Sequence, residues 1–92
     1  MKLVFRQHAI QRMFERRISV EDVNAALANG KIIENYPNDT PYQSRLLLGY
    51  AAARPLHVVV ADNASDEEQI IITVYEPDPA QWELTFTLRK KS

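Results

Sequence analysis

Two apolar stretches decide the fold of this chain: LHVVVA at residues 56–61 and QIIITVY at residues 69–75. β-Branched residues dominate both, and such side chains suit the pleated surface of a sheet better than a helix. Apolar residues occupy nearly every position rather than every second one. Both strands are therefore predicted to be central and to be covered on both faces.

Two further stretches with strand character precede these, at residues 31–36 and 45–50. Short segments rich in turn-forming residues separate all four, so we predict a four-stranded antiparallel meander. After the last of these strands, Asp78 is expected to open a short helical turn. A fifth short strand is expected at residues 85–88.

The thirty N-terminal residues predict two helices. Between residues 6 and 17, four apolar side chains return at intervals of three and four, which is typical of one buried helix face: Ala9, Ile10, Met13 and Phe14. Ser19 and Asp22 have the spacing of a capping box at the start of a second helix, residues 19–29. The pair Asn29-Gly30 is expected to supply a left-handed residue that ends this helix.

These elements predict an α+β fold, in which two N-terminal helices pack on a four-stranded antiparallel sheet, or on a five-stranded one if residues 85–88 join it. Residues 1–92 are expected to form a single domain, because a chain of 92 residues supports one core. The helices cover only one face of the sheet. We expect the C-terminal segment or a partner chain to cover the other.

The composition excludes several classes of protein. The chain has no cysteine, which rules out disulfide frameworks and cysteine nucleophiles and favours a reducing, cytoplasmic location. It contains no phosphate-binding loop or other cofactor motif, and the spacing of its two histidines indicates no metal site. We therefore expect neither metal nor cofactor. No apolar run approaches the roughly 20 residues that span a bilayer, so no membrane contact is expected.

The net charge of −1 hides an uneven distribution of charge. Residues 1–17 contain five cationic side chains and one acid, whereas residues 62–84 contain seven acids and no lysine or arginine. Such clustering predicts a cationic patch for an anionic partner. The alternative is a basic face that is only solvated.

His8, Arg12 and Arg16 are the most informative set of polar residues, because their spacing of four places them along one stripe of the first helix. An imidazole and two guanidinium groups match what metal-independent RNA cleavage needs. Attack of the 2′-hydroxyl on phosphorus requires a base, a proton donor for the leaving oxygen, and cations for the developing charge. The alternative is that the arginines pair with Glu15, Asp22 or carboxylates of the strands.

A second set of candidates comes from the strands. Side-chain alternation places Thr73 and Tyr75 on one face of the fourth strand, and His57 on one face of the third. If these faces coincide, His57, Tyr75 and Arg45 meet the helical stripe. His57 would then be acid or base, Arg45 would bind phosphate and Tyr75 would donate a hydrogen bond. The alternative for His57 is a hydrogen-bonded core position. Trp82 is expected to plug exposed sheet surface, the alternative being a platform on which a base stacks.

Three blocks of sequence carry a family resemblance: HAIQRMFERRIS at residues 8–19, PLHVVV at 55–60 and TVYEPDPAQW at 73–82. Together they resemble the small bacterial proteins grouped as domain of unknown function 4258. The resemblance implies two helices followed by an antiparallel sheet, similar to the barnase, colicin and RelE/BrnT group of metal-independent ribonucleases and toxins. It assigns site positions to His8, Arg12, Arg16, His57, Thr73 and Tyr75. Arg17 departs from the family pattern, which often has glycine there, so a strained left-handed turn or a different turn is expected.

The leading hypothesis is a toxin-like, metal-independent endoribonuclease that acts on RNA and has an antitoxin-like protein partner. The rival is a non-catalytic interaction module that binds an acidic protein or a second copy of the chain. A third hypothesis is a degenerate ribonuclease fold that binds RNA without cutting it.

Overall fold

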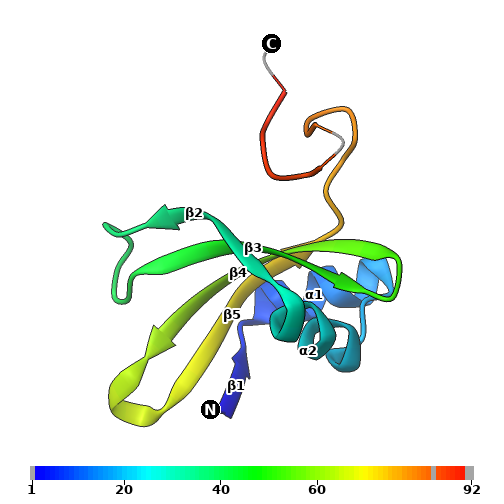
Figure 1. The fold of residues 1–92 in the computed structure, drawn as a ribbon. Helices are drawn as coiled ribbons and strands as arrows, with labels where there is room; N and C mark the ends of the chain where they lie inside the picture. Colours follow the sequence, from blue (N-terminus) through cyan, green and yellow to red (C-terminus); the bar gives the residue numbers. More distant parts are fainter. Residues whose placement is uncertain (1, 84, 91–92) are drawn as a thin grey trace.

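The four strands predicted from residues 31–75 are consecutive in a five-stranded mixed sheet in the computed structural model, which describes residues 2–83 and 85–90 (Figure 1). The sheet order is β1-β5-β4-β3-β2. The elements are, in chain order, β1 (Lys2–Phe5), α1 (Gln7–Arg16), α2 (Val20–Asn29), β2 (Lys31–Tyr36), β3 (Ser44–Ala51), β4 (Arg54–Asn63), a 3-10 turn η1 (Ala64–Asp66) and β5 (Glu68–Tyr75). The predicted α+β class, with two helices on a sheet, is confirmed.

The fifth strand comes from the N-terminus and not from residues 85–88. β1 pairs in parallel with β5, so the sheet is mixed and the expectation of purely antiparallel pairing was wrong for this edge. Residues 85–88 form turns and bends, and the C-terminal segment contributes only an isolated bridge between Trp82 and Arg89. The two edges of the sheet are β1 and β2, so this segment lies over a face of the sheet instead of extending it.

α1 packs on β5 through a narrower stripe than its sequence predicted. Ala9 and Met13 are buried, but Ile10 is 54% exposed and Phe14 is 87% exposed. The helix lies towards the β1 edge of the sheet, and its contacts are mainly with β5. Because one strand supports it, the helix buries only the residues that point directly at that strand. The expectation that Ile10 and Phe14 belong to the core was therefore wrong.

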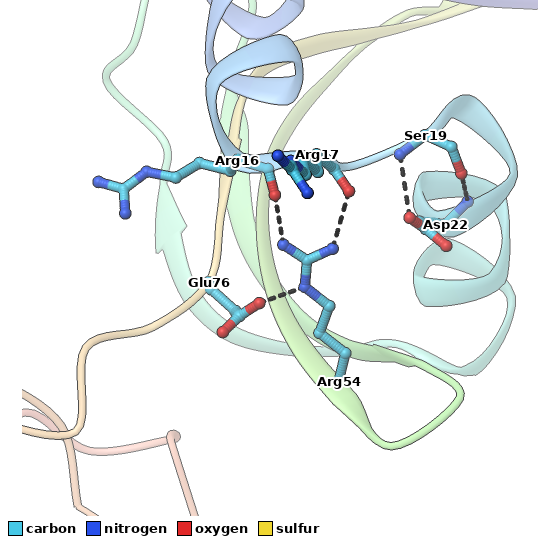
Figure 2. Close-up of polar contacts among 6 residues, drawn as sticks. All are labelled: Arg16, Arg17, Ser19, Asp22, Arg54 and Glu76. Atoms are coloured by element: carbon cyan, nitrogen blue, oxygen red, sulfur yellow. Dashed lines mark hydrogen bonds and ion pairs between the residues drawn. The ribbon is translucent and has the colours of Figure 1, made fainter.

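The connection between the helices depends on Arg17, which has φ 56° and ψ 47°. This left-handed conformation ends α1, as the family's usual glycine would, and it is strained for a residue with a Cβ atom. Arg54 provides hydrogen-bond donors for two carbonyl groups at the C-terminal end of α1. Its terminal nitrogens donate to the carbonyl oxygens of Arg16, at 2.6 Å, and Arg17, at 2.9 Å. Its Nε donates to the carboxylate of Glu76 (Figure 2).

α2 begins as predicted and ends differently. The Ser19 hydroxyl accepts from the backbone N–H of Asp22 and the Asp22 carboxylate accepts from that of Ser19, both at 3.0 Å, which confirms the capping box (Figure 2). Gly30 has φ −73° and is not left-handed, so that expectation was wrong. The Asn29 side chain bonds the backbone of Tyr50 in both directions, at 2.7 and 2.8 Å, and joins the end of α2 to β3.

The two faces of the sheet are covered by different kinds of structure. The face under the helices holds the main apolar core, which includes Leu47, Leu56, Val58, Val60, Ile71 and Val74. The opposite face carries His57, and the C-terminal segment reaches it through Trp82, which is 3% exposed (Figure 1). The chain thus supplies its own cover for this part of the second face, and Trp82 is the predicted plug. Among the described residues, no helix is long and apolar enough to cross a membrane.

Candidate functional site

A cleft opens where α1, the end of β5 and the C-terminal segment meet. β1 is short: its register with β5 ends at the pair Phe5 and Ile71, so in the described part of the chain residues 73–75 of β5 are paired on the β4 side only. The cleft occupies this edge and has a volume of about 510 Å³. Its lining residues are His8, Arg12, Arg16, Thr73, Tyr75, Glu76, Asp78, Gln81, Trp82 and Arg89.

The helical stripe forms one wall of the cleft. His8, Arg12 and Arg16 all line it, as their spacing of four along α1 predicts. Within residues 2–83 and 85–90, none of these three side chains forms a hydrogen bond or an ion pair, and the Arg16 guanidinium points away from Arg54 and Glu76 (Figure 2). The pairing with protein carboxylates that would make the stripe purely structural is not found there.

β5 supplies Thr73 and Tyr75 to the same cleft. The structure therefore brings together five of the seven residues that the sequence indicated, from segments more than fifty residues apart. Burial raises the pKa of the Tyr75 hydroxyl, so this group keeps its proton at neutral pH. Its oxygen lies 3.3 Å from His57 Nδ1.

His57 does not line the cleft, because its imidazole is 0% exposed below Tyr75 and Trp82. Its Nε2 lies 2.8 Å from the carbonyl oxygen of Phe86 and must carry the proton, since a carbonyl only accepts. Nδ1 then accepts from the Tyr75 hydroxyl. Burial lowers the pKa of His57 and favours this neutral form. The geometry matches the alternative of a hydrogen-bonded core residue.

Arg45 lies away from the cleft. On β3 it pairs with Val60 of β4, whereas His57, three residues before Val60, pairs with Tyr75. Its guanidinium binds the Asp62 carboxylate through two nitrogens, at 3.0 and 3.3 Å, and lines a separate hollow. The expected meeting of Arg45 with the helical stripe does not occur.

The sequence did not indicate the third wall of the cleft, which the C-terminal segment forms. Asp78, Gln81 and Arg89 line it together with the edge of Trp82. The Arg89 guanidinium carbon lies 4.8 Å from the centre of the Trp82 ring, a cation–π contact. Asp78, Gln81 and Trp82 belong to the sequence block 73–82 that carries the family resemblance, whereas Arg89 lies outside all three blocks. Among the described residues, no group of three or more His, Asp or Glu side chains is arranged to hold a metal ion.

The fold and the cleft define a small α+β protein with an open site lined by polar, aromatic and charged side chains, of which three are arginines and two are carboxylates. The family model described as domain of unknown function (DUF4258) matches residues 5–76, and the chain belongs to this family. The matched range contains the walls from α1 and β5 but ends before Asp78, so the third wall lies outside it. No curated protein and no solved structure matches the chain. The resemblance to the barnase and RelE group therefore stays a prediction.

Proposed function

We propose that the cleft binds RNA and cleaves it without metal, by attack of a 2′-hydroxyl on the adjacent phosphate. One observation carries the proposal: a base and two arginines on α1 face the same cleft as the hydroxyl groups of Thr73 and Tyr75 on β5. The arginines have no partner among the described side chains. A phosphate is the anion that this combination of groups suits best.

Each group has a role in the proposed reaction. His8 takes the proton of the 2′-hydroxyl, since an imidazole nitrogen with a free lone pair is a proton acceptor and this side chain lines the cleft. Arg12 and Arg16 bind the non-bridging oxygens and stabilise the charge that develops there. Thr73 orients the phosphate. The protonated Tyr75 hydroxyl turns from its long contact with His57 to donate a hydrogen bond to the phosphate. The P–O5′ bond breaks as the 2′-oxygen attacks, and the leaving 5′-oxygen takes a proton from solvent in the open cleft.

The experiment is cleavage of labelled RNA by the purified protein in EDTA. His8→Ala and Arg12→Ala are each expected to lower the rate by about a hundredfold or more, the usual contribution of a general base or of a charge-stabilising donor. Arg6→Ala is the matched control, because it removes the same charge near the start of α1 without touching the cleft lining. An inactive wild type at high protein concentration would refute the enzymatic proposal.

RNA binding without turnover is the outcome that would favour a degenerate ribonuclease fold. Binding through phosphate contacts should weaken steeply between about 50 and 200 mM salt. Arg12→Ala should then reduce the affinity even though no product forms. An affinity for RNA that changes neither with the salt concentration nor with Arg12→Ala would count against any role of the cleft in RNA recognition.

The second candidate function is a protein-interaction module, favoured by the exposure of Ile10 and Phe14. On a helix these side chains lie on the flank of the buried stripe opposite to Arg12, so a partner bound there leaves the cleft open. We propose a second copy of the chain as the partner that binds this surface, and sedimentation measures whether the protein is a dimer. An apolar dimer should persist in high salt, and the Phe14→Ser variant should be monomeric. A wild type that is itself monomeric would exclude the homodimer. An antitoxin-like protein partner stays a prediction.

A further inference from the structure

Among the described residues of the C-terminal segment, Arg89 is the cationic residue that lines the cleft. Its side chain is 60% exposed, and one face of its guanidinium lies over Trp82. Nε is 3.9 Å from the carboxylate of Glu34, a long and partly exposed ion pair of small energetic weight. Within the described residues, no hydrogen bond uses its terminal nitrogens, so these donors are open to a ligand.

The position of Arg89 is fixed by contacts deeper in the segment. Trp82 and Arg89 form a backbone bridge, and Lys90 N–H donates to the carbonyl of Gln81 at 2.8 Å, so the segment folds back on itself. His57 anchors this fold from the sheet. Its Nε2–H donates to the Phe86 carbonyl, and its ring packs edge-on against Trp82 with a centroid distance of 4.4 Å. Arg89 is therefore held in place before any ligand arrives.

The two carboxylates in the cleft are engaged by other groups and compete little with a bound anion. The carboxylate of Glu76 accepts a hydrogen bond from Arg54 of β4, whose guanidinium also binds the carbonyl groups at the end of α1. Asp78 caps its own turn by accepting from the backbone N–H of Ala80 at 2.9 Å. Each long wall thus presents at least one guanidinium group to the cleft: Arg12 and Arg16 on one side, and Arg89, beside Asp78, on the other.

We propose that Arg89 is a second phosphate-binding residue, which holds a phosphate next to the one bound by Arg12 and Arg16. The inference rests on the proposed RNA-binding function of the cleft. It defines the ligand as a single-stranded oligonucleotide with at least two phosphates, because guanidinium groups on two facing walls match anionic groups on both sides of the bound strand. His57 and Trp82 are positioning residues that act through Arg89.

The test is binding of a labelled single-stranded DNA hexanucleotide, which lacks the 2′-hydroxyl and is not cleaved. Affinity is measured by fluorescence anisotropy from 50 to 200 mM salt for the wild type, Arg89→Met, Arg89→Lys and Arg12→Ala. Arg89→Met keeps much of the side-chain length without the charge. It is expected to lower the affinity about tenfold, the loss of one charge-assisted hydrogen bond, and to reduce the salt slope by about 0.7. Arg89→Lys should restore the slope.

Trp82 is the single tryptophan of the chain, so its emission reports whether the segment stays packed in each variant. An unchanged emission with a lower salt slope supports phosphate binding by Arg89. An unchanged emission with unchanged affinity in Arg89→Met overturns the inference, and a loss in Arg12→Ala alone would leave the proposed function standing. If neither substitution affects binding, both proposals fail. If Arg89→Met shifts the emission, the comparison is made with Arg89→Lys, whose own emission must match that of the wild type. An affinity of Arg89→Lys equal to that of the wild type then supports the inference, and a tenfold loss overturns it.

Discussion

The two faces of the sheet are stabilised by different means. On one face, two regular helices pack on apolar side chains, and α2 approaches β3 so closely that only glycine fits at residue 49. On the other face, an irregular segment is attached through one imidazole and one indole. Apolar packing is insensitive to pH and hard to undo in part, whereas a polar anchor depends on protonation and can open locally. The candidate cleft uses one wall from each kind of cover.

The largest expected effect concerns the close contact of α2 with β3. A Cβ atom at residue 49 would lie 2.0 Å from the backbone oxygen of Ala26. This oxygen belongs to the backbone of α2, which cannot move aside as a flexible side chain could. Gly49→Ala is therefore expected to lower the free energy of unfolding by about 3 kcal/mol. Urea denaturation measures it. A loss below about 1 kcal/mol would mean that α2 moves away from the sheet at little cost, and that this face is less rigid than the contact indicates.

The polar anchor on the other face should respond next most strongly. His57→Leu removes the donor to the Phe86 carbonyl and leaves the Tyr75 hydroxyl without its acceptor, at an expected cost of about 2 kcal/mol. Release of the segment should also move the emission of Trp82 to the red. A matched cavity on the helical face, Val58→Ala, should destabilise the protein without shifting that emission. A shift of equal size in both variants would show that the faces are not independent.

The pH dependence of stability separates the faces further. Because burial lowers the pKa of His57 in the folded state, the unfolded chain binds the proton more readily below its ordinary pKa, about 6.5. Stability should therefore fall as the pH drops from 7 to 5, by at most about 1.4 kcal/mol per pH unit. Thermal unfolding at a series of pH values measures it. His57→Leu should make stability nearly independent of pH in this range. If the variant keeps the slope of the wild type, the pH dependence arises from other titratable groups.

The smallest effect is expected where the helices join. Arg17 is left-handed, and glycine adopts that conformation without the steric cost but loses more entropy on folding. Arg17→Gly should therefore raise the free energy of unfolding by about 0.5 kcal/mol. Glu15→Gly, inside the exposed face of α1, is the control and should lower it by about 1 kcal/mol. A loss of stability in Arg17→Gly would mean that the Arg17 side chain makes a contribution larger than the strain.

Local patterns predicted most of the regular elements. The intervals of three and four residues located α1, the Ser19 and Asp22 pair located the start of α2, and the β-branched stretches located the strands. β1 was missed because four residues ahead of a helix carry too short a pattern, and its partner lies more than sixty residues away. The exposure of Phe14 was missed because the width of a buried helix stripe depends on how many strands lie beneath it.

The candidate site was predictable only where the pattern is local or coincides with the family signature. The alternation in β5 placed Thr73 and Tyr75 together, and the spacing along α1 aligned His8 with its two arginines. Arg45 was misplaced because its surroundings depend on pairing across three strands. Arg89 was not singled out, since no repeat or motif connects it to residues near the N-terminus.

The sequence by itself determined the helices, the main strands, the absence of cysteine chemistry and the cationic stripe of α1, because each follows from residues close together in the chain. Only the tertiary structure decided which strand flanks β5, which face the C-terminal segment covers and which arginines find carboxylates. These outcomes depend on pairings between distant segments. Such pairings are selected by the packing of the whole core, and short-range periodicity carries no information about them.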